Sequence, residues 1–429
     1  MRFLAAVLLL ALPAALAQNP PKCGAMHERR SAHSLSPAEW QRLGRVVYQL
    51  HRQGQFDRFA RAHNVVFDEV HGTAAFFPFH RRFVQEFEDL GRRIDPGFTI
   101  PYWDTPRDYR DPASSPVLQR DKLGRDGRVS DSCVLDGVQG GWGSLFPGRH
   151  CLQRNFNDGD SILPWVPPEM ISSYLQSDRA LGLFREHIEY GIHGAVHLGL
   201  GGDAATPFAP NDLFFFMHHA NIDRLWWQWQ IGHRSIFDYN GPGPDGDATL
   251  DDVIPESRDV NFGGERVWST MVLGFGSMCY TYDTAPPAPN AYPGARSRAT
   301  QNNWDMPAFV LSGASNTTEA SLEVARIHAA FDTAPGLKDL FPGVAALEPA
   351  LSRDGAQLGD RGVQLGDRGA RCNSNNKDML EARKLVYPAP LTSAWIEMHG
   401  FDSARVKQLY DEGCRLIDML NNSTYESPY

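Results

Sequence analysis

The chain has 429 residues, of which 42% are hydrophobic and 11% aromatic, enough to bury a large core. Its formal net charge of −10 argues against nucleic acid or an anionic membrane as a partner, because both require clustered basic residues. A small neutral substrate is compatible with this balance.

The first residues of the chain have the pattern of a secretory signal. A basic Arg2 is followed by an apolar run, and Ala15-Leu16-Ala17 supplies small residues just before a cut. The run is too short and wrongly flanked for a membrane anchor. We therefore expect residues 1–17 to be a signal peptide and the mature protein to be secreted.

The cysteines also indicate an exported protein. An even set in an exported chain favours up to three disulfides, whose pairing the sequence leaves open. Cys133 and Cys151 flank a Gly-rich stretch and form the easiest local pair to imagine. The full set is Cys23, Cys133, Cys151, Cys279, Cys372 and Cys414. Asn316, Asn421 and Asn422 fit the glycosylation acceptor pattern.

The first predicted helix spans residues 37–52. Ser36 can cap it, Pro37 suits the first helical position, and Glu39 completes a capping box. Apolar residues then recur at helical spacing, which predicts one buried face.

Three further segments have helical patterns, and each contains histidine. The run Phe77 to Leu90 carries His80 near its start, and a third pattern opens at His219. His193 and His197 are four residues apart, so on a helix both imidazoles project from one face. Ligands would then come from several facing helices, as in metal sites built inside helical bundles.

The rest of the chain is less regular. Residues 105–165 are rich in Gly, Pro, Asp and Ser. This composition predicts long ordered loops, which a disulfide between Cys133 and Cys151 would hold together. A Pro-rich linker is expected after Tyr282, and a tandem repeat over residues 356–369 predicts a flexible loop. Residues 391–420 have a helical pattern to which the sequence assigns no task.

Two groups of three histidines predict two metal sites with open coordination positions. Neutral imidazole is a ligand for copper, zinc, iron and nickel. A di-iron site would need Glu-x-x-His pairs, and a zinc protease would need a glutamate where Gly194 stands. The all-histidine composition therefore favours copper. The two groups are His63, His71 and His80, and His193, His197 and His219.

Long motifs surround these histidines in a recognisable order. The first runs from His71-Gly72 through Phe76-Phe77-Pro78-Phe79-His80-Arg81 and Glu88 to Pro101-Tyr102-Trp103-Asp104; the second runs from His193-x-x-x-His197 through Asn211-Asp212 to His218-His219-Ala220-Asn221-Ile222-Asp223-Arg224-Leu225-Trp226. With Cys279-Tyr280-Thr281-Tyr282, these motifs resemble the type 3 copper proteins, namely tyrosinases, catechol oxidases (polyphenol oxidases) and haemocyanins.

The resemblance implies a mainly α fold, with a four-helix bundle around a dinuclear copper centre, long loops and little β structure. It assigns His63, His71 and His80 to copper A, and His193, His197 and His219 to copper B, choosing His219 over its neighbour His218. Residues 18–285 would form the catalytic domain. Residues 286–429 would be a C-terminal extension of unknown role, which shields the active site in some relatives and would otherwise simply pack against the catalytic domain.

The activity implied is that of a secreted copper-dependent oxidoreductase with two copper ions and O2 as co-substrate. It would oxidise o-diphenols, with monophenols and o-aminophenols as further candidates, to o-quinone-type products. The alternative is a true tyrosinase that hydroxylates monophenols; haemocyanin-like O2 binding is less favoured, because the chain has one copper unit. The partners are a small phenol and O2, with no nucleic acid or membrane; the oligomeric state is not predicted.

Two residues bear on the choice between catechol oxidase and tyrosinase. Glu189 lies where plant relatives place a glutamate that, with an asparagine after the first copper B histidine, is proposed to hold a water that deprotonates monophenols. Gly194 stands at the asparagine position and has no side chain. We therefore expect diphenol oxidation to be favoured over monophenol hydroxylation. Asp212 and Asp223 are candidates by position for orienting the imidazoles.

Overall fold

The computed structural model describes residues 21–233, 235–243, 246–283, 384–422 and 427. The signal peptide, the Pro-rich linker and the tandem repeat expected from the sequence lie outside these residues, as do Asn316 and Cys372.

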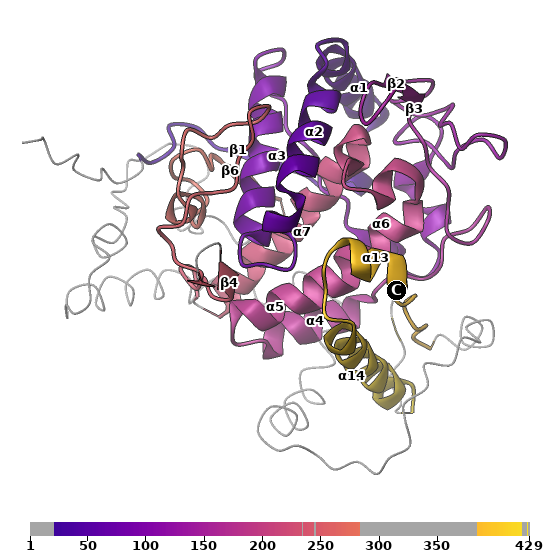
Figure 1. Cartoon of the computed structure of the whole chain (residues 1–429). Helices are drawn as coiled ribbons and strands as arrows, with labels where there is room; N and C mark the ends of the chain where they lie inside the picture. Colours follow the sequence, from indigo (N-terminus) through magenta and orange to yellow (C-terminus); the bar gives the residue numbers. More distant parts are fainter. Residues whose placement is uncertain (1–20, 234, 244–245, 284–383, 423–426, 428–429) are drawn as a thin grey trace, which may run out of the picture.

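Helices dominate the described part of the chain (Figure 1). They are α1 (Pro37–Arg52), α2 (Gln55–Val70), α3 (Phe76–Arg92), α4 (Pro168–Ser177), α5 (Leu181–Ile188), α6 (Gly194–Leu200), α7 (Leu213–Gly232), α13 (Ser393–Met398) and α14 (Ser403–Asn421), with a π-helical turn at Glu189–His193. Short strands pair as β1 (His27–Arg29) with β6 (Tyr280–Tyr282), β2 (Gly143–Ser144) with β3 (His150–Cys151), and β4 (Pro242–Gly243) with β5 (Gly246–Asp247). The expected mainly α fold with little β structure is confirmed.

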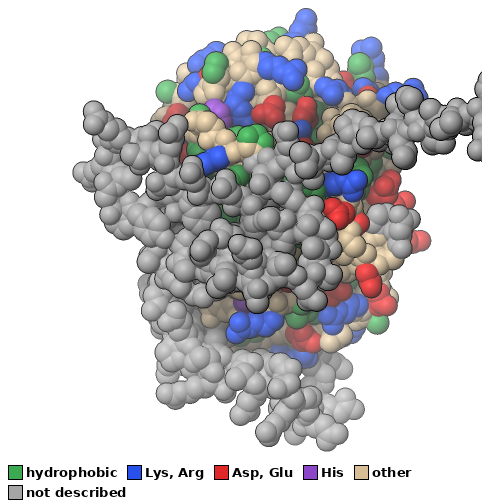
Figure 2. All heavy atoms as spheres, turned by 90° about the vertical axis from the view of Figure 1, so that its left-hand side faces the viewer, with side chains coloured by type: hydrophobic (Ala, Val, Ile, Leu, Met, Phe, Trp, Pro, Cys, Tyr) green, Lys and Arg blue, Asp and Glu red, His purple; other side chains and the backbone are tan. Residues whose placement is uncertain are grey.

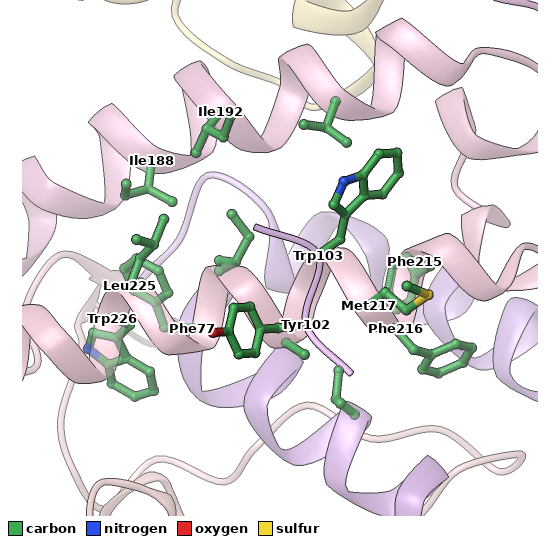
Figure 3. Packing of buried hydrophobic residues seen from close by; sticks show 14 of the residues in the cluster. Phe77, Tyr102, Trp103, Ile188, Ile192, Phe215, Phe216, Met217, Leu225 and Trp226 are labelled. Carbon is green, nitrogen blue, oxygen red and sulfur yellow. The ribbon is translucent and has the colours of Figure 1, made fainter. Parts of the chain in front are cut away.

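A helical bundle forms the centre of the molecule. Helix α7 is buried on every side over nearly its whole length, and it packs along α3. Aromatic side chains fill the contact, since the Phe77 and Trp226 rings stack with 5.2 Å between their centroids (Figure 3). Phe87 stacks on Phe216 in the same way, with 3.8 Å between the centroids. Stacked aromatic rings bury a large apolar area, so these pairs stabilise the contact between the two helices.

The predicted boundaries are right for α1 and wrong for α7. Helix α1 spans Pro37–Arg52 and has the expected capping box between Ser36 and Glu39. Helix α7 begins at Leu213, well before His219, with Asp212 accepting a hydrogen bond from the Phe214 N–H. Its first turns are apolar all round, so they lack the one-sided periodicity from which a helix start is read.

Disulfides hold the irregular segments. Cys133 and Cys151 are bonded, as expected for the long loops of residues 105–165. A second bond joins Cys23 to Cys279, beside the β1–β6 pair. Cys414 is also disulfide-bonded. The expectation of disulfides is thus confirmed.

The two C-terminal helices pack on the bundle (Figure 1). Helix α14 lies against α4 so closely that a Cβ on Gly413 would meet Met170 Cε at 2.2 Å. Arg405 donates to Glu186 Oε2 from two nitrogens, at 2.8 and 2.7 Å. The Ala389 N–H donates to the Pro164 carbonyl at 2.9 Å. Residues 384–422, which we call the tail segment, are therefore part of the same folded body.

Three further observations concern the helices and the surface. None of the helices in the described ranges is long and apolar enough to cross a membrane. Acidic and basic side chains are interspersed on the described part of the face in Figure 2. Of the two described glycosylation candidates, Asn421 is buried and its amide is hydrogen-bonded to Leu385, whereas Asn422 is exposed. Asn421 therefore does not present its amide for modification in this fold.

Candidate dinuclear metal centre

The structure brings the first three histidines together. His63 lies on α2, His71 directly follows α2, and His80 lies in the first turns of α3. The Nε2 atoms of His71 and His80 each lie 3.3 Å from Nε2 of His63. Ligand atoms about 2 Å from an ion in a tetrahedral arrangement are about 3.3 Å apart, so this triad fits a first-row metal ion.

The second three histidines converge in the same way. His193 ends the π-helical turn, His197 lies on α6, and His219 lies inside α7. In each triad, one ring nitrogen of every histidine lies within 4.8 Å of those of the other two. His219, not its neighbour His218, joins the set, as the sequence analysis expected.

The two triads face each other. His80 and His219 stack at 4.0 Å with planes 7° apart, and His71 lies 5.5 Å from His193. Because α3 and α7 pack together, they place one imidazole from each triad side by side. The arrangement can hold two ions close to each other.

Backbone carbonyls fix the ring tautomers at three positions. His63 Nδ1 lies 2.7 Å from the Pro207 carbonyl oxygen, His80 Nδ1 2.7 Å from that of Phe76, and His197 Nδ1 2.6 Å from that of Ala204. A carbonyl only accepts, so Nδ1 carries the proton and donates, which leaves the Nε2 lone pair free for a metal. These carbonyls were not predicted, because no sequence signal marks a backbone acceptor.

The imidazoles are neutral because they are buried. Desolvation lowers the pKa of His63 to about 4 and those of the other five well below the usual value. Neutral imidazole is the form that ligates metals. Nε2 of His197 and both ring nitrogens of His193 and His219 are buried without a protein partner, which a bound ion would remedy. The donor set thus fits two copper ions.

Glu189 lies beneath the first triad. Its Oε1 accepts a hydrogen bond from the Gly72 N–H at 2.8 Å and lies 3.2 Å from His71 Nδ1, while its Oε2 pairs with Arg185. Burial raises the pKa of Glu189 to about 7, against the opposing charge of Arg185. The carboxylate is therefore placed to orient the His71 ring. Its expected role in holding a catalytic water stays a prediction.

Gly194 lies under the tail segment. A Cβ built on it would be 2.6 Å from Leu391 Cδ2 and 3.0 Å from Trp395 Nε1. Ordinary Cβ contacts are longer, so glycine is what allows α13 to approach α6 this closely. From the sequence alone, only the lack of an amide side chain at this position could be noted.

The suggestion that Asp212 and Asp223 orient the imidazoles is wrong. Asp212 forms a two-bonded pair with Arg154 at 2.6 and 2.8 Å. Asp223 is bound by Arg29, Arg81, Tyr280 and Tyr282, so it ties α7 to the β1–β6 pair. Buried arginines near both positions supply stronger partners than a neutral imidazole does.

The tail segment places two further rings over the site, and the sequence analysis missed both. Trp395 lies 5.5 Å from His197 and 6.2 Å from His193, between ring centroids. His399 lies 4.9 Å from His71 and 4.8 Å from Phe67. The sequence showed a helical pattern over residues 391–420, but nothing in that pattern indicated which surface the segment covers.

Comparisons with known proteins agree with this geometry. Residues 53–231 match the model of the common central domain of tyrosinase. The chain is similar to the tyrosinase ustQ of Aspergillus flavus, with 31% identity over 57% of this chain and 72% of that protein. It is also similar to the tyrosinase of Streptomyces antibioticus, with 32% identity over 55% of this chain and 94% of that protein.

A solved structure supports the fold. A variant of the polyphenol oxidase from Thermothelomyces thermophila superposes with a TM-score of 0.51 and 24% identity, over 61% of this chain and 90% of that one. At this identity the likeness extends to the fold alone.

Proposed function

The chain belongs to the tyrosinase family of copper oxidoreductases, and we propose from this premise that it oxidises o-diphenols to o-quinones with O2. The cofactor is the family's dicopper centre, which supplies O2 binding and the electron transfer when it is loaded. We assign copper A to His63, His71 and His80, and copper B to His193, His197 and His219. Two diphenols each lose two electrons and two protons, and one O2 becomes two waters.

One observation carries this proposal: two buried triads of neutral imidazoles face each other, with His80 and His219 stacked at 4.0 Å. The protein's own part is to fix these rings, which it does through carbonyls and Glu189, and to exclude water with a shell of phenylalanines around the rings.

The preference for diphenols over monophenols rests on Gly194 and Glu189. A monophenol must lose its proton before it is hydroxylated, and Gly194 offers no group to hold a water for that step. Both oxygens of Glu189 already have partners, in Gly72 and Arg185. A diphenol only has to be oxidised, so the missing base matters less. The alternative is a true tyrosinase active on monophenols as well.

We further propose that residues 18–285 form the catalytic domain, and that the tail segment limits access to it. Trp395, in α13, lies over the second triad, and His399, which directly follows α13, lies over the first. A phenol would have to displace them to reach the rings. Secretion is proposed from the signal-like start, and the disulfides are compatible with it.

Oxygen uptake by the copper-loaded full chain tests the proposal. Catechol is compared with a simple monophenol that is primed by a trace of catechol. Uptake on catechol alone supports a catechol oxidase. Sustained uptake on both substrates makes the protein a tyrosinase and removes the argument from Gly194. Reversible O2 binding without consumption of catechol would instead indicate a haemocyanin-like protein.

A further inference from the structure

A cavity of about 190 Å³ lies between the bundle and the tail segment, and none of the six triad histidines lines it. Helices α4 and α5 and the π-helical turn form its wall on the bundle side, and residues 388–391, α13 and α14 form its wall on the tail side. An apolar cavity of about 150 Å³ is large enough to bind benzene. The space therefore suits a ligand with a single ring.

Much of the wall is apolar or aromatic. Met170 lines the cavity from the bundle, and Leu391 and Ile396 line it from the tail segment. The ring of Tyr174 stacks on that of His187, with 4.1 Å between the centroids and the planes 5° apart. Aromatic rings and a methionine thioether both make favourable contacts with a further ring. This wall favours a flat, apolar ligand body.

The charged side chains of the wall are already paired. Glu186 Oε2 accepts hydrogen bonds from two nitrogens of Arg405, at 2.8 and 2.7 Å. Lys407 pairs with Asp411, one turn further along α14. A charged ligand would have to compete with these pairs, whereas a neutral ligand leaves them intact. The wall therefore favours a neutral ligand.

His187 offers one polar atom to such a ligand. Its Nδ1 lies 2.7 Å from Asp178 Oδ2, and a carboxylate only accepts, so Nδ1 donates. Among the described residues, Nε2 has no hydrogen-bond partner, although the side chain is only 9% exposed. A hydroxyl can donate to Nε2 of a neutral ring and accept from Nε2 of a protonated one. A ligand hydroxyl therefore fits this nitrogen in either state.

We propose that the cavity binds a small neutral phenol, with its ring against the apolar wall and its hydroxyl on His187 Nε2. The ligand touches the bundle and the tail segment at once, so it binds the docked form and stabilises it. Because α13 lies over the triads in that form, phenol bound here holds the site closed and slows oxidation. This effect on the rate rests on the proposed function, but the binding itself does not.

Amide exchange over α13, Ser393–Met398, distinguishes this cavity from the dinuclear centre. Phenol in the cavity keeps α13 docked and slows exchange, whereas phenol at the triads has to displace α13 and speeds exchange. The copper-loaded full chain is measured without O2, so that no phenol is oxidised. A ligand of this size binds with a Kd on the order of 1 mM. We therefore expect about 10 mM phenol to slow exchange about 10-fold. Unchanged or faster exchange would overturn the proposal.

Fluorobenzene is the matched ligand, because it keeps the ring and lacks the hydroxyl. We expect it to bind at least about 3-fold more weakly than phenol, since Nε2 then stays unpaired. Equal binding of the two ligands would overturn the proposal.

Two variants of α14 locate the bound phenol. Val406 lines the cavity, so Val406→Phe fills part of it and should abolish the slowing by phenol. Met419 is exposed and does not line the cavity, so Met419→Phe should keep the slowing. Slowing that persists in Val406→Phe would overturn the proposal. If Val406→Phe undocks α13 without ligand, the comparison of phenol with fluorobenzene in the wild type decides.

Discussion

The bundle and the tail segment meet at the same site but are encoded differently. Five of the six imidazoles stand in the long motifs, and helices α2, α3, α6 and α7 carry four of the six directly. Trp395 and His399 come from a short helix with no motif. The histidine ligands are therefore determined by local spacing, whereas access to them is determined by packing between distant segments.

The two regions also differ in how firmly they are held. Helix α7 is buried throughout, whereas the tail segment joins the main core only through residues such as Leu385, Val386 and Ile417, and α13 is held by a smaller cluster around Trp395 and Phe401. A cavity of about 190 Å³ remains between the tail and the bundle, lined by Tyr190, Leu391 and Ile396 among others. Incomplete packing makes the tail the region that opens more easily.

The largest effect should come from breaking a triad inside the bundle. We expect His219→Gln to lower the copper content from two ions to one. The two imidazoles that remain in the second triad, His193 and His197, cannot hold an ion by themselves. Diphenol oxidation should fall at least about 100-fold, since even outer groups of metal sites contribute 10–100-fold. The first expectation is checked by measuring copper per chain, and the second by measuring oxygen uptake with catechol.

The adjacent His218→Gln is the matched control. It is equally buried, but it is not in the converged set. It should keep both copper ions. If His218→Gln lost a copper ion and His219→Gln kept both, His218 and not His219 would be the copper B ligand.

Opening the tail should raise the rate of diphenol oxidation, whereas breaking a triad lowers it. Trp395→Ala removes a buried ring, and such truncations cost about 3–5 kcal/mol of packing. The undocked population rises, so catechol oxidation should increase roughly 10-fold. Trp142→Ala, which removes a ring stacked on His51 of α1, is the control and should give no gain. Equal rates for wild type and Trp395→Ala would mean that the tail does not limit access.

Gly194 lies where the bundle and the tail segment meet, so its variants affect both regions. Any side chain there must push Leu391 and Trp395 away, and both Gly194→Ala and Gly194→Asn should loosen the tail. Only asparagine adds a group that can hold a water. We expect Gly194→Asn alone to raise monophenol turnover relative to diphenol turnover, by about 3-fold or more. An unchanged ratio would count against the role given to Gly194.

The smallest effect concerns a contact between β3 and the turn after α6, which does not involve the tail. Burial lowers the pKa of His150, but its hydrogen bond to Gly148 and the charge of Asp203, 3.0 Å away, outweigh this and raise it. A raised histidine pKa stabilises the fold below its unfolded value, and that stability is lost as pH rises through the folded pKa.

Unfolding at about pH 6 and about pH 8.5 measures this loss, which should not exceed about 1 kcal/mol. His150→Gln should flatten the difference, while Trp395→Ala should leave it unchanged. A pH dependence that disappears in Trp395→Ala would place its origin in the tail instead.

The sequence predicted the site better than its surroundings. All six imidazoles converge as expected, because spacing on helices determines which side chains share a face. The carbonyls of Pro207 and Ala204 could not be predicted, since they follow from the positions of short turns. Asp212 and Asp223 were misread for the same reason, as their arginine partners are far away in the sequence.

The docking of the tail segment is the feature that the sequence predicts least well. Its helices were readable from periodicity, and α14 ends close to where the pattern ends. Where they dock depends on the fit of Trp395 against Gly194 and of Gly413 against Met170, two contacts between residues about 200 or more positions apart. Such contacts leave no local pattern.

The most direct test is to measure copper per chain and oxygen consumed in one preparation of full chain, with Trp395→Ala beside wild type. We expect two copper ions in both proteins, one O2 consumed for two catechols, and faster consumption by Trp395→Ala. Two bound copper ions with no consumption of catechol by either protein would contradict this expectation.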